Sequence, residues 1–302
     1  MRSIDEFLDA CRPVIERESH DGVLWHYTSL DSLVRIAESS CVHMSSFAFM
    51  NDPAEGALPP DVLGKCWLDA IDRIEPPYRF DLEYMRAMVE ELEGFNKRGP
   101  NKADPFVFSL TVLRDSLSQW ARYGNDGAGV ALGFRVSPPD LTLSGKGWKY
   151  GPLLHEILYL GDEPSTPERS TADSAAIVGF RDKLTVLLHG FLTAIQDPTD
   201  AENALFILTD TLRPLLKNGA YHEEKEWRLT ASTAIESTDL YSLRAGRFGL
   251  VPFLKVPLGT GLALTEIMIG PKVPRASLWS LEWLCRKYGI QAAISESKLV
   301  YR

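Results

Sequence analysis

Apolar residues spaced three and four positions apart predict helices in several parts of the chain. The first helix is expected over residues 4–15, after a capping box formed by Ser3 and Glu6. A short helix is expected from Asp115, as its cap, to Gly124, a glycine typical of the position after a helix end. The other helical spacings fall at 29–37, 60–96, 172–218 with a break near Asp197 and Pro198, and 277–289.

Short apolar runs bounded by turn residues predict strands. These runs do not alternate regularly with single helices, which argues against a doubly wound sheet or a TIM barrel. We therefore expect an α+β fold with a mixed, mainly antiparallel sheet and helices packed on it. It would form one domain over 1–302, with helical insertions at about 56–100 and 165–220. The predicted strands lie at 23–25, 42–49, 106–110, 130–134, 157–160, 227–230, 250–256, 267–269 and 292–301.

The composition narrows the classes of partner. The formal net charge is −9, which does not favour nucleic acid or an anionic membrane, although a local basic patch stays open. The acidic N-terminus and the lack of a long apolar stretch favour a cytoplasmic protein without a membrane anchor. Four cysteines without a CxxC pair predict free thiols, and the six histidines lack metal-ligand spacing, so we expect no metal.

Polar residues gather at four places, each of which also has a structural explanation. A histidine at a strand end is commonly structural, Asn-Asp-Pro forms turns, and a Trp–Tyr pair on a helix commonly packs in a core. The four places are His26-Tyr27-Thr28-Ser29, Asn51-Asp52-Pro53 with Glu55, Ser109 followed by Gln119-Trp120 and Tyr123-Gly124, and Glu224-Lys225-Glu226-Trp227-Arg228.

The last of these places has the clearest chemical potential. Alternate residues of a strand share one face, so Glu224, Glu226 and Arg228 are expected side by side. Two carboxylates beside a cation form a charge cluster that can shift the pKa of one acid. The same pattern is also compatible with a solvated strand edge.

Known nucleotide and hydrolase motifs do not match. The glycines between 124 and 133 follow a helix and enter a strand, which reverses the order in a dinucleotide-binding loop. The sequence contains no Walker A, HExxH or GxSxG motif.

Taken together, the polar places resemble a bacterial family of uncharacterised proteins, the domain of unknown function 2971. The order and combination of the motifs carry the resemblance, which extends over nearly the whole chain outside the two insertions. The motifs are His26-Tyr27-Thr28, Phe49 with Asn51-Asp52-Pro53 and Glu55, Phe108-Ser109-Leu110, Trp120-Ala121-Arg122-Tyr123-Gly124 with Gly129, Lys217, Glu224-Lys225-Glu226-Trp227-Arg228, Leu250-Val251-Pro252-Phe253, Ile269-Gly270-Pro271 and Tyr301-Arg302.

A more distant likeness is to ADP-ribosyltransferases of the His-Tyr-Glu type and their DNA-modifying relatives. His26-x-Thr28 before a short helix is similar to the opening of the DNA-modifying toxins, and Glu224-Lys225-Glu226 looks like the Glu-x-Glu of protein-modifying members. The likeness implies a split sheet and an enzyme that consumes NAD as substrate. It would transfer ADP-ribose to a macromolecular acceptor or hydrolyse NAD, in a bacterial defence or toxin role.

The likeness also implies roles for individual residues. Glu226 would stabilise the oxocarbenium ion that forms as nicotinamide leaves, and Glu224 would orient or deprotonate the acceptor. The middle motif of the superfamily has two candidates, Ser45-Ser46 and Ser109. The residues expected to contact NAD are His26 on the adenosine ribose, Tyr27 or Tyr123 on nicotinamide, Arg228 or Arg122 on the pyrophosphate, and Thr28, Asn51 and Ser109.

Two other functions stay open at this point. The same pocket would serve a non-catalytic nucleotide-binding or sensor domain that recognises a phosphorylated molecule without consuming it. A hydrolase or nuclease that uses His26 with acidic residues, with or without a metal, is the third hypothesis.

Overall fold

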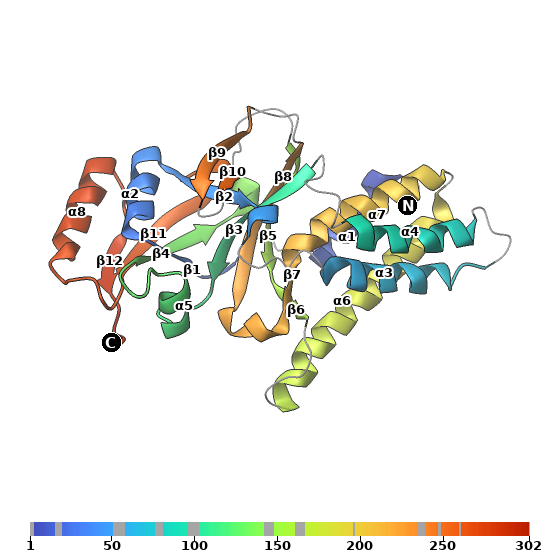
Figure 1. Ribbon diagram of the computed structural model, residues 1–302, viewed down its shortest axis with the longest axis horizontal. Helices are drawn as coiled ribbons and strands as arrows, with labels where there is room; N and C mark the ends of the chain where they lie inside the picture. Colours follow the sequence, from blue (N-terminus) through green and yellow to red (C-terminus); the bar gives the residue numbers. More distant parts are fainter. Residues whose placement is uncertain are drawn as a thin grey trace. The chain divides into compact units, whose positions relative to one another are not determined.

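The computed structural model describes residues 3–15, 20–50, 58–75, 81–95, 103–141, 148–160, 167–195, 197–234, 239–246, 249–259 and 261–301. The chain divides into two compact units, each made of several segments. Figure 1 colours the chain by residue number and labels its helices and strands. The first unit comprises Met1–Glu16, Phe47–Pro105 and Ile157–His222, and the second comprises Arg17–Ser46, Phe106–Glu156 and Glu223–Arg302. Both expected helical insertions fall in the first unit. The single domain stays a prediction.

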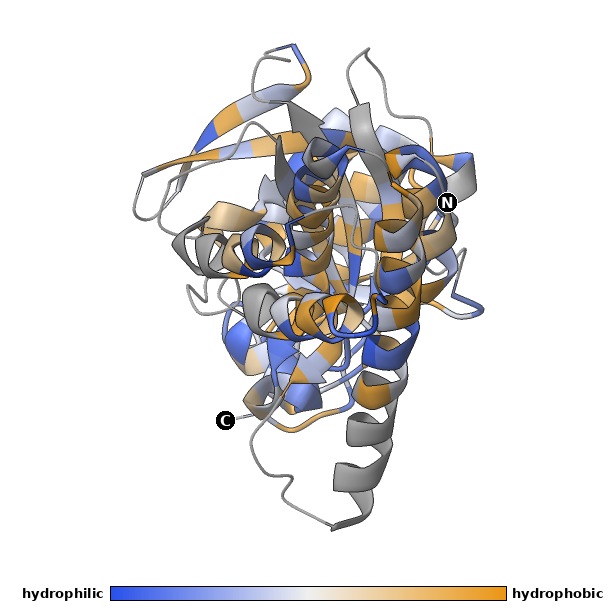
Figure 2. Ribbon diagram, turned by 90° about the vertical axis from the view of Figure 1, so that its right-hand side faces the viewer, coloured by the Kyte–Doolittle hydropathy of each residue, from blue (hydrophilic) through white to orange (hydrophobic). Residues whose placement is uncertain are grey.

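The first unit is mainly helical. Its core joins residues from far-apart segments, since Phe7 stacks on Phe191 with ring centroids 4.4 Å apart. The buried indole of Trp67 donates a hydrogen bond to the carbonyl of Met85 at 3.0 Å, which satisfies its polar atom inside the core. Figure 2 shows hydrophobic and hydrophilic residues alternating along these helices. The elements are α1 (Ile4–Ile15), η1 (Phe47–Phe49), α3 (Leu58–Ile71), α4 (Leu82–Phe95), α6 (Pro167–Ala194), α7 (Pro198–Leu212) and η4 (Arg213–Leu215), with the parallel strand pair β6 (Leu158–Leu160) and β7 (Leu216–Asn218).

The second unit is built on a sheet of 10 strands, mostly antiparallel, in which β11–β12 is a parallel pair. The mixed α+β architecture with a mainly antiparallel sheet is therefore confirmed. The main path runs β12-β11-β4-β1-β3-β2-β10-β9, and β8 joins it by pairing with β3 and with β5. The strands are β1 (Leu24–Thr28), β2 (Cys41–Ser46), β3 (Ala103–Thr111), β4 (Val130–Val136), β5 (Trp148–Glu156), β8 (Glu226–Ala234), β9 (Tyr241–Gly246), β10 (Gly249–Pro257), β11 (Leu262–Ile269) and β12 (Ala293–Glu296).

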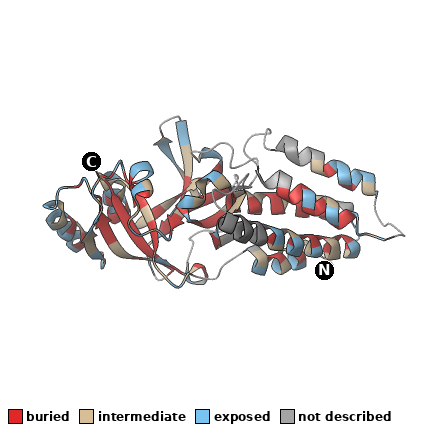
Figure 3. Ribbon diagram, turned by 90° about the horizontal axis from the view of Figure 1, so that it is seen from below, coloured by how far each residue is buried: buried red, intermediate tan, exposed pale blue. Residues whose placement is uncertain are grey.

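Side chains alternate between the two faces of this sheet, and each face has its own core. On one face Leu24, Phe108 and Leu132 join the larger core, against which α2 (Leu30–Ser39) and α8 (Ser277–Tyr288) pack. On the other face Trp25 joins a smaller core with Trp120 of α5 (Leu117–Arg122). Figure 3 shows the strands of this sheet largely buried. The sheet thereby carries α5 on one face and the other two helices on the opposite face.

Short helical turns complete the description: η3 (Pro138–Asp140) follows β4, and η5 (Gly219–Glu224) precedes β8. None of the described helices is long and apolar enough to cross a membrane. All four cysteines are free thiols. Burial raises the pKa of Cys11 to about 12, so this thiol is protonated and inert at neutral pH.

Candidate functional site

The Glu224–Arg228 segment does not form one continuous strand. Glu224 ends η5, and Lys225 adopts a left-handed backbone conformation with φ 44°. Strand β8 therefore begins at Glu226. The expectation that all three charged residues share one strand face is wrong, because the kink at Lys225 takes Glu224 out of the strand. Only Glu226 and Arg228 share a face by alternation.

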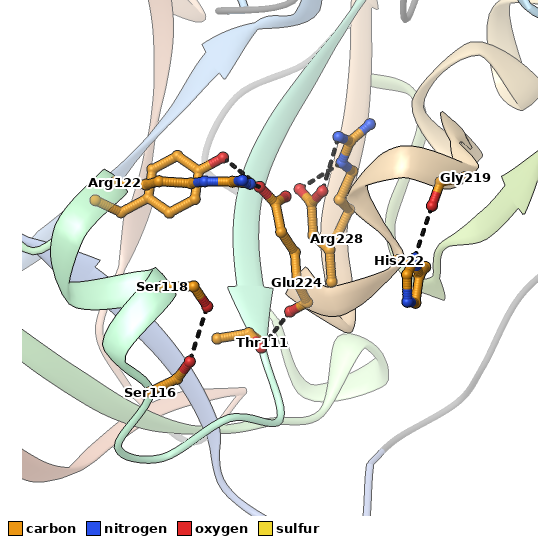
Figure 4. A network of polar contacts seen from close by, with 10 residues as sticks. Thr111, Ser116, Ser118, Arg122, Gly219, His222, Glu224 and Arg228 are labelled. Carbon is orange, nitrogen blue, oxygen red and sulfur yellow. Dashed lines mark hydrogen bonds and ion pairs between the residues drawn. The ribbon is translucent and has the colours of Figure 1, made fainter. Parts of the chain in front are cut away.

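The carboxylate of Glu224 is buried and is held by two side chains from the end of α5. Arg122 Nη1 donates to Oε1 at 3.0 Å, and the Tyr123 hydroxyl donates to the same oxygen at 2.8 Å (Figure 4). Glu224 is 4% exposed, whereas the Arg122 side chain is 52% exposed and Tyr123 is 38% exposed. The buried acid is thus bound by two side chains that themselves reach the solvent.

The backbone of the same segment is anchored to the end of β3. The hydroxyl of Thr111 donates to the Glu224 carbonyl at 2.6 Å, and the amide of Val112 donates to the Lys225 carbonyl at 3.4 Å. These bonds bring the start of β8 to the end of β3. They place Glu224 close to α5, which follows β3 in the chain.

Glu226 and Arg228 form a side-on ion pair. Arg228 Nε donates to Oε1 at 2.7 Å and Nη2 donates to Oε2 at 3.0 Å. The side chains are 6% and 0% exposed, so the pair is desolvated. Next to it, the His155 ring and the Thr230 hydroxyl share a hydrogen bond of 2.9 Å. Two buried charges of opposite sign bind each other here, and breaking a buried ion pair strongly destabilises a fold.

His26 on β1 is bound to the neighbouring strand. Its Nδ1 lies 2.9 Å from the Ser109 carbonyl, and its ring lies 4.5 Å from the Phe108 ring. Because a carbonyl only accepts, Nδ1 carries the proton. Burial lowers the pKa of His26, and the bond to the Ser109 carbonyl opposes this shift in part. The imidazole is therefore neutral at neutral pH.

His26 and Glu226 point to opposite faces of the sheet. His26 packs on Phe108, a member of the larger core. Trp227 and Leu229 of β8 belong to that same core. Glu226 and Arg228 alternate with them along the strand, so their side chains point to the other face. The alternation therefore places His26 and Glu226 on different faces of the sheet.

Tyr27 is bonded through its hydroxyl to the backbone of the loop before α5. Its hydroxyl hydrogen bonds with the carbonyls of Leu113 and Arg114 at 3.0 and 2.8 Å and accepts from the amide of Ser116 at 3.1 Å. Its ring packs edge-on against Trp120 at 4.7 Å. Tyr27 thus shapes the loop before α5, which leaves Tyr123 as the better placed of the two candidate stacking rings.

Asp115 was expected to cap α5, but the cap position is Ser116. Asp115 instead joins α5 to the C-terminal segment. Its Oδ1 accepts from Trp120 Nε1 at 2.7 Å and from the Ser297 hydroxyl at 2.8 Å, and its Oδ2 accepts from the Lys298 amide at 3.0 Å. These bonds fix the helix that presents Arg122 and Tyr123.

Asp115→Ala is expected to lower the free energy of unfolding by roughly 2 kcal/mol, because the indole N–H of Trp120 loses its partner inside the small core. Urea unfolding measures this loss, and hydrogen exchange should become faster over residues 297–301. Asp31→Ala, which removes an exposed ion pair with Arg35, is the control and should change stability by less than about 0.5 kcal/mol. Equal midpoints for the two variants would contradict the proposed link.

The structure brings together part of the expected site. Glu224 meets Arg122 and Tyr123, Glu226 meets Arg228, and His26 meets Ser109 through its carbonyl. Thr28 pairs with Val130 at the end of β1. Asn51, with its neighbours Asp52, Pro53 and Glu55, lies outside the described residues.

Sequence reasoning missed Thr111 and Asp115 as residues that support the site. Their bonds join positions 113 and 182 residues apart, and neither lies in a recognisable motif. Among the described residues, no three His, Cys, Asp or Glu side chains are grouped so that they could hold a metal ion.

The comparisons with known proteins give one match. No curated protein and no solved structure matches the chain. The model of the family "Protein of unknown function (DUF2971)" matches residues 119–229. This range includes Arg122 and Tyr123 as well as the Glu224–Arg228 segment, so it contains the cluster around Glu224. The match supports the resemblance to this family that the motifs indicated.

Proposed function

We propose that this protein is an NAD-consuming enzyme of the ADP-ribosyltransferase-like type, which transfers ADP-ribose to a macromolecular acceptor or hydrolyses NAD. One observation carries the proposal: a buried carboxylate, Glu224, lies beneath the exposed side chains of Arg122 and Tyr123. A second carboxylate, Glu226, follows two residues later and is neutralised by Arg228. A role in bacterial defence or as a toxin would follow from intracellular NAD depletion.

The proposed reaction needs an acid where positive charge develops. The bond between nicotinamide and ribose breaks, and its electron pair moves to the pyridinium nitrogen, so nicotinamide leaves neutral. The ribosyl cation is then captured by an acceptor or by water, which loses one proton. A carboxylate beside the ribose stabilises the cation mainly in the transition state. Glu224 fits this position because two of the side chains that bind it, Arg122 and Tyr123, reach the solvent.

The neighbouring side chains suit the other parts of NAD. Arg122 has an exposed guanidinium that can bind the pyrophosphate through two parallel hydrogen bonds. The half-exposed ring of Tyr123 can stack on nicotinamide. Arg228, the other candidate for pyrophosphate, is 0% exposed and bound to Glu226, so we assign it to orienting that acid. His26 and Tyr27 support the strands and the loop around the site.

The direct test is incubation of the purified protein with NAD, with free nicotinamide measured by chromatography. We expect nicotinamide release that is absent from a heat-denatured sample. A protein that neither releases nicotinamide nor gains thermal stability in the presence of NAD would contradict the proposal.

Arg122→Ala is expected to raise the KM for NAD by roughly tenfold or more with a smaller change in kcat, because a charge-assisted contact to the pyrophosphate is lost. Arg114→Ala removes another exposed arginine, one that pairs with Glu266, and serves as the matched control. Equal KM values for the wild type and Arg122→Ala would show that Arg122 does not bind the substrate.

A nucleotide-binding sensor is the second candidate function. The side-on pair of Glu226 with Arg228 favours it, since a carboxylate neutralised in this way is suited to holding shape as much as to catalysis. Thermal stabilisation by both NAD and ADP-ribose without any nicotinamide release would distinguish this function from the enzyme.

A further inference from the structure

Helix α8 exposes two tryptophans on one face. Trp279 is 73% exposed and Trp283 is 70% exposed. They lie four residues apart, so their rings are neighbours on the helix surface. The opposite face of α8 is buried through Leu281 and Cys285 in the larger core of the second unit. The fold thus uses one face of α8 for packing and leaves two large aromatic rings in water.

Basic residues continue the same exposed face. With 3.6 residues per turn, Trp279, Trp283, Arg286 and Lys287 fall within roughly a third of the helix circumference. Arg275, whose side chain is 82% exposed, lies just before the helix and pairs with Glu296 at 3.6 Å. Of the four basic residues at 272–289, Lys272 likewise pairs with an acid, Asp126. Arg286 and Lys287 therefore supply the positive charge of this face, although the whole chain has a net charge of −9. The helix dipole explains cations in the last turn of α8, but it does not explain the tryptophans.

The residues exposed on this face of α8 can be compared with what three kinds of partner need: a membrane, a second copy of the chain and single-stranded nucleic acid. A helix that lies on a membrane buries a broad face of Trp, Phe and Leu side chains in lipid. The exposed residues of the described α8 besides the two tryptophans are Ser280, Glu282 and the two cations, so this face is too narrow and polar. A second copy of the chain, packed symmetrically on this face, would bring like charges together. Single-stranded nucleic acid matches both features, because its bases stack on aromatic rings and its phosphates bind cations.

We infer that the Trp279–Trp283 face of α8 binds single-stranded nucleic acid. Bases stack on the two indoles, and Arg286 and Lys287 bind the phosphates beside them. This interaction is independent of the NAD chemistry proposed above, since α8 packs on the sheet face opposite to α5.

The test is fluorescence anisotropy of a labelled oligodeoxythymidylate of about 20 nucleotides, titrated with the full chain at about 50 mM salt. We expect saturable binding that the double variant Trp279→Ala/Trp283→Ala weakens by at least about tenfold. Arg286→Glu should also weaken binding, and the slope of log affinity against log salt should be shallow, about −2 or smaller in magnitude, because few phosphates are contacted.

Tyr84→Ala is the matched control, because Tyr84 is a 50% exposed aromatic residue on α4 in the other unit. The Tyr84→Ala variant should bind the oligonucleotide with the affinity of the wild type. The inference is overturned if the oligonucleotide does not bind, or if the double variant binds as tightly as the wild type. It is also overturned if the two tryptophans instead support binding to phosphatidylserine vesicles, or a dimer that the double variant dissociates.

Discussion

Replacing Arg228 with methionine is expected to lower the free energy of unfolding by about 3–5 kcal/mol. Arg228 is fully buried and donates two hydrogen bonds to Glu226, so its removal takes two charge-assisted hydrogen bonds from a buried carboxylate. Urea or thermal unfolding of the purified variant measures the loss. Methionine keeps much of the side-chain volume, so the measured effect reports the lost charge pair more than a cavity.

A double variant distinguishes the loss of one charge from the loss of both. The double variant Glu226→Leu/Arg228→Met removes both charges and is expected to recover most of the stability that Arg228→Met loses. Arg114→Met breaks an exposed pair with Glu266 and should cost less than about 1 kcal/mol. If Arg228→Met unfolds at the same midpoint as Arg114→Met, the buried pair has no structural role.

Glu224→Gln is expected to slow nicotinamide release by roughly a hundredfold to a thousandfold without loss of fold. The amide oxygen can still accept from Arg122 and Tyr123, so the geometry is kept while the negative charge is lost. Glu223→Gln is the matched control, because Glu223 is the exposed neighbour in η5. Its rate should equal that of the wild type.

Glu226→Gln completes the comparison of the two acids. It removes the charge opposite the buried Arg228, so we expect it to lower both the rate and the unfolding midpoint. A variant that loses all activity with an unchanged midpoint would instead identify Glu226 as the acid beside the ribose. If neither glutamine variant slows nicotinamide release, the site lies elsewhere.

Elements with strong local signals were predicted well. The capping box and the spacing from residue 4 to 15 correspond to α1, and the break near Asp197 and Pro198 separates α6 from α7. Strand β4 was expected because five of its residues form a continuous apolar run. In each case the apolar pattern and the turn residues lie within one short segment, so local physics decides the element.

Other strands depend on partners that are distant in the sequence. The segment of β5, Trp148–Glu156, contains Gly151 and Pro152 and shows no clear alternation, so we did not predict it. It forms because β8 pairs with it from His155↔Arg228 to Leu153↔Thr230. β9 was missed as well, since it is an edge strand with partly exposed residues, and its hydrogen bonds come from β10.

In the candidate site, too, some features follow from local sequence and others depend on residues that are distant in the chain. The sequence by itself determined which residue types gather at four places, the α+β class, and the resemblance to the family whose model matches residues 119–229. Only the tertiary structure decided which of them meet. Glu224 is bound by Arg122 from 102 residues away, and a left-handed Lys225 separates it from Glu226. The sheet places the side chains of His26 and Glu226 on opposite faces. Which face a side chain takes depends on how the strands pair, and no local pattern encodes that pairing.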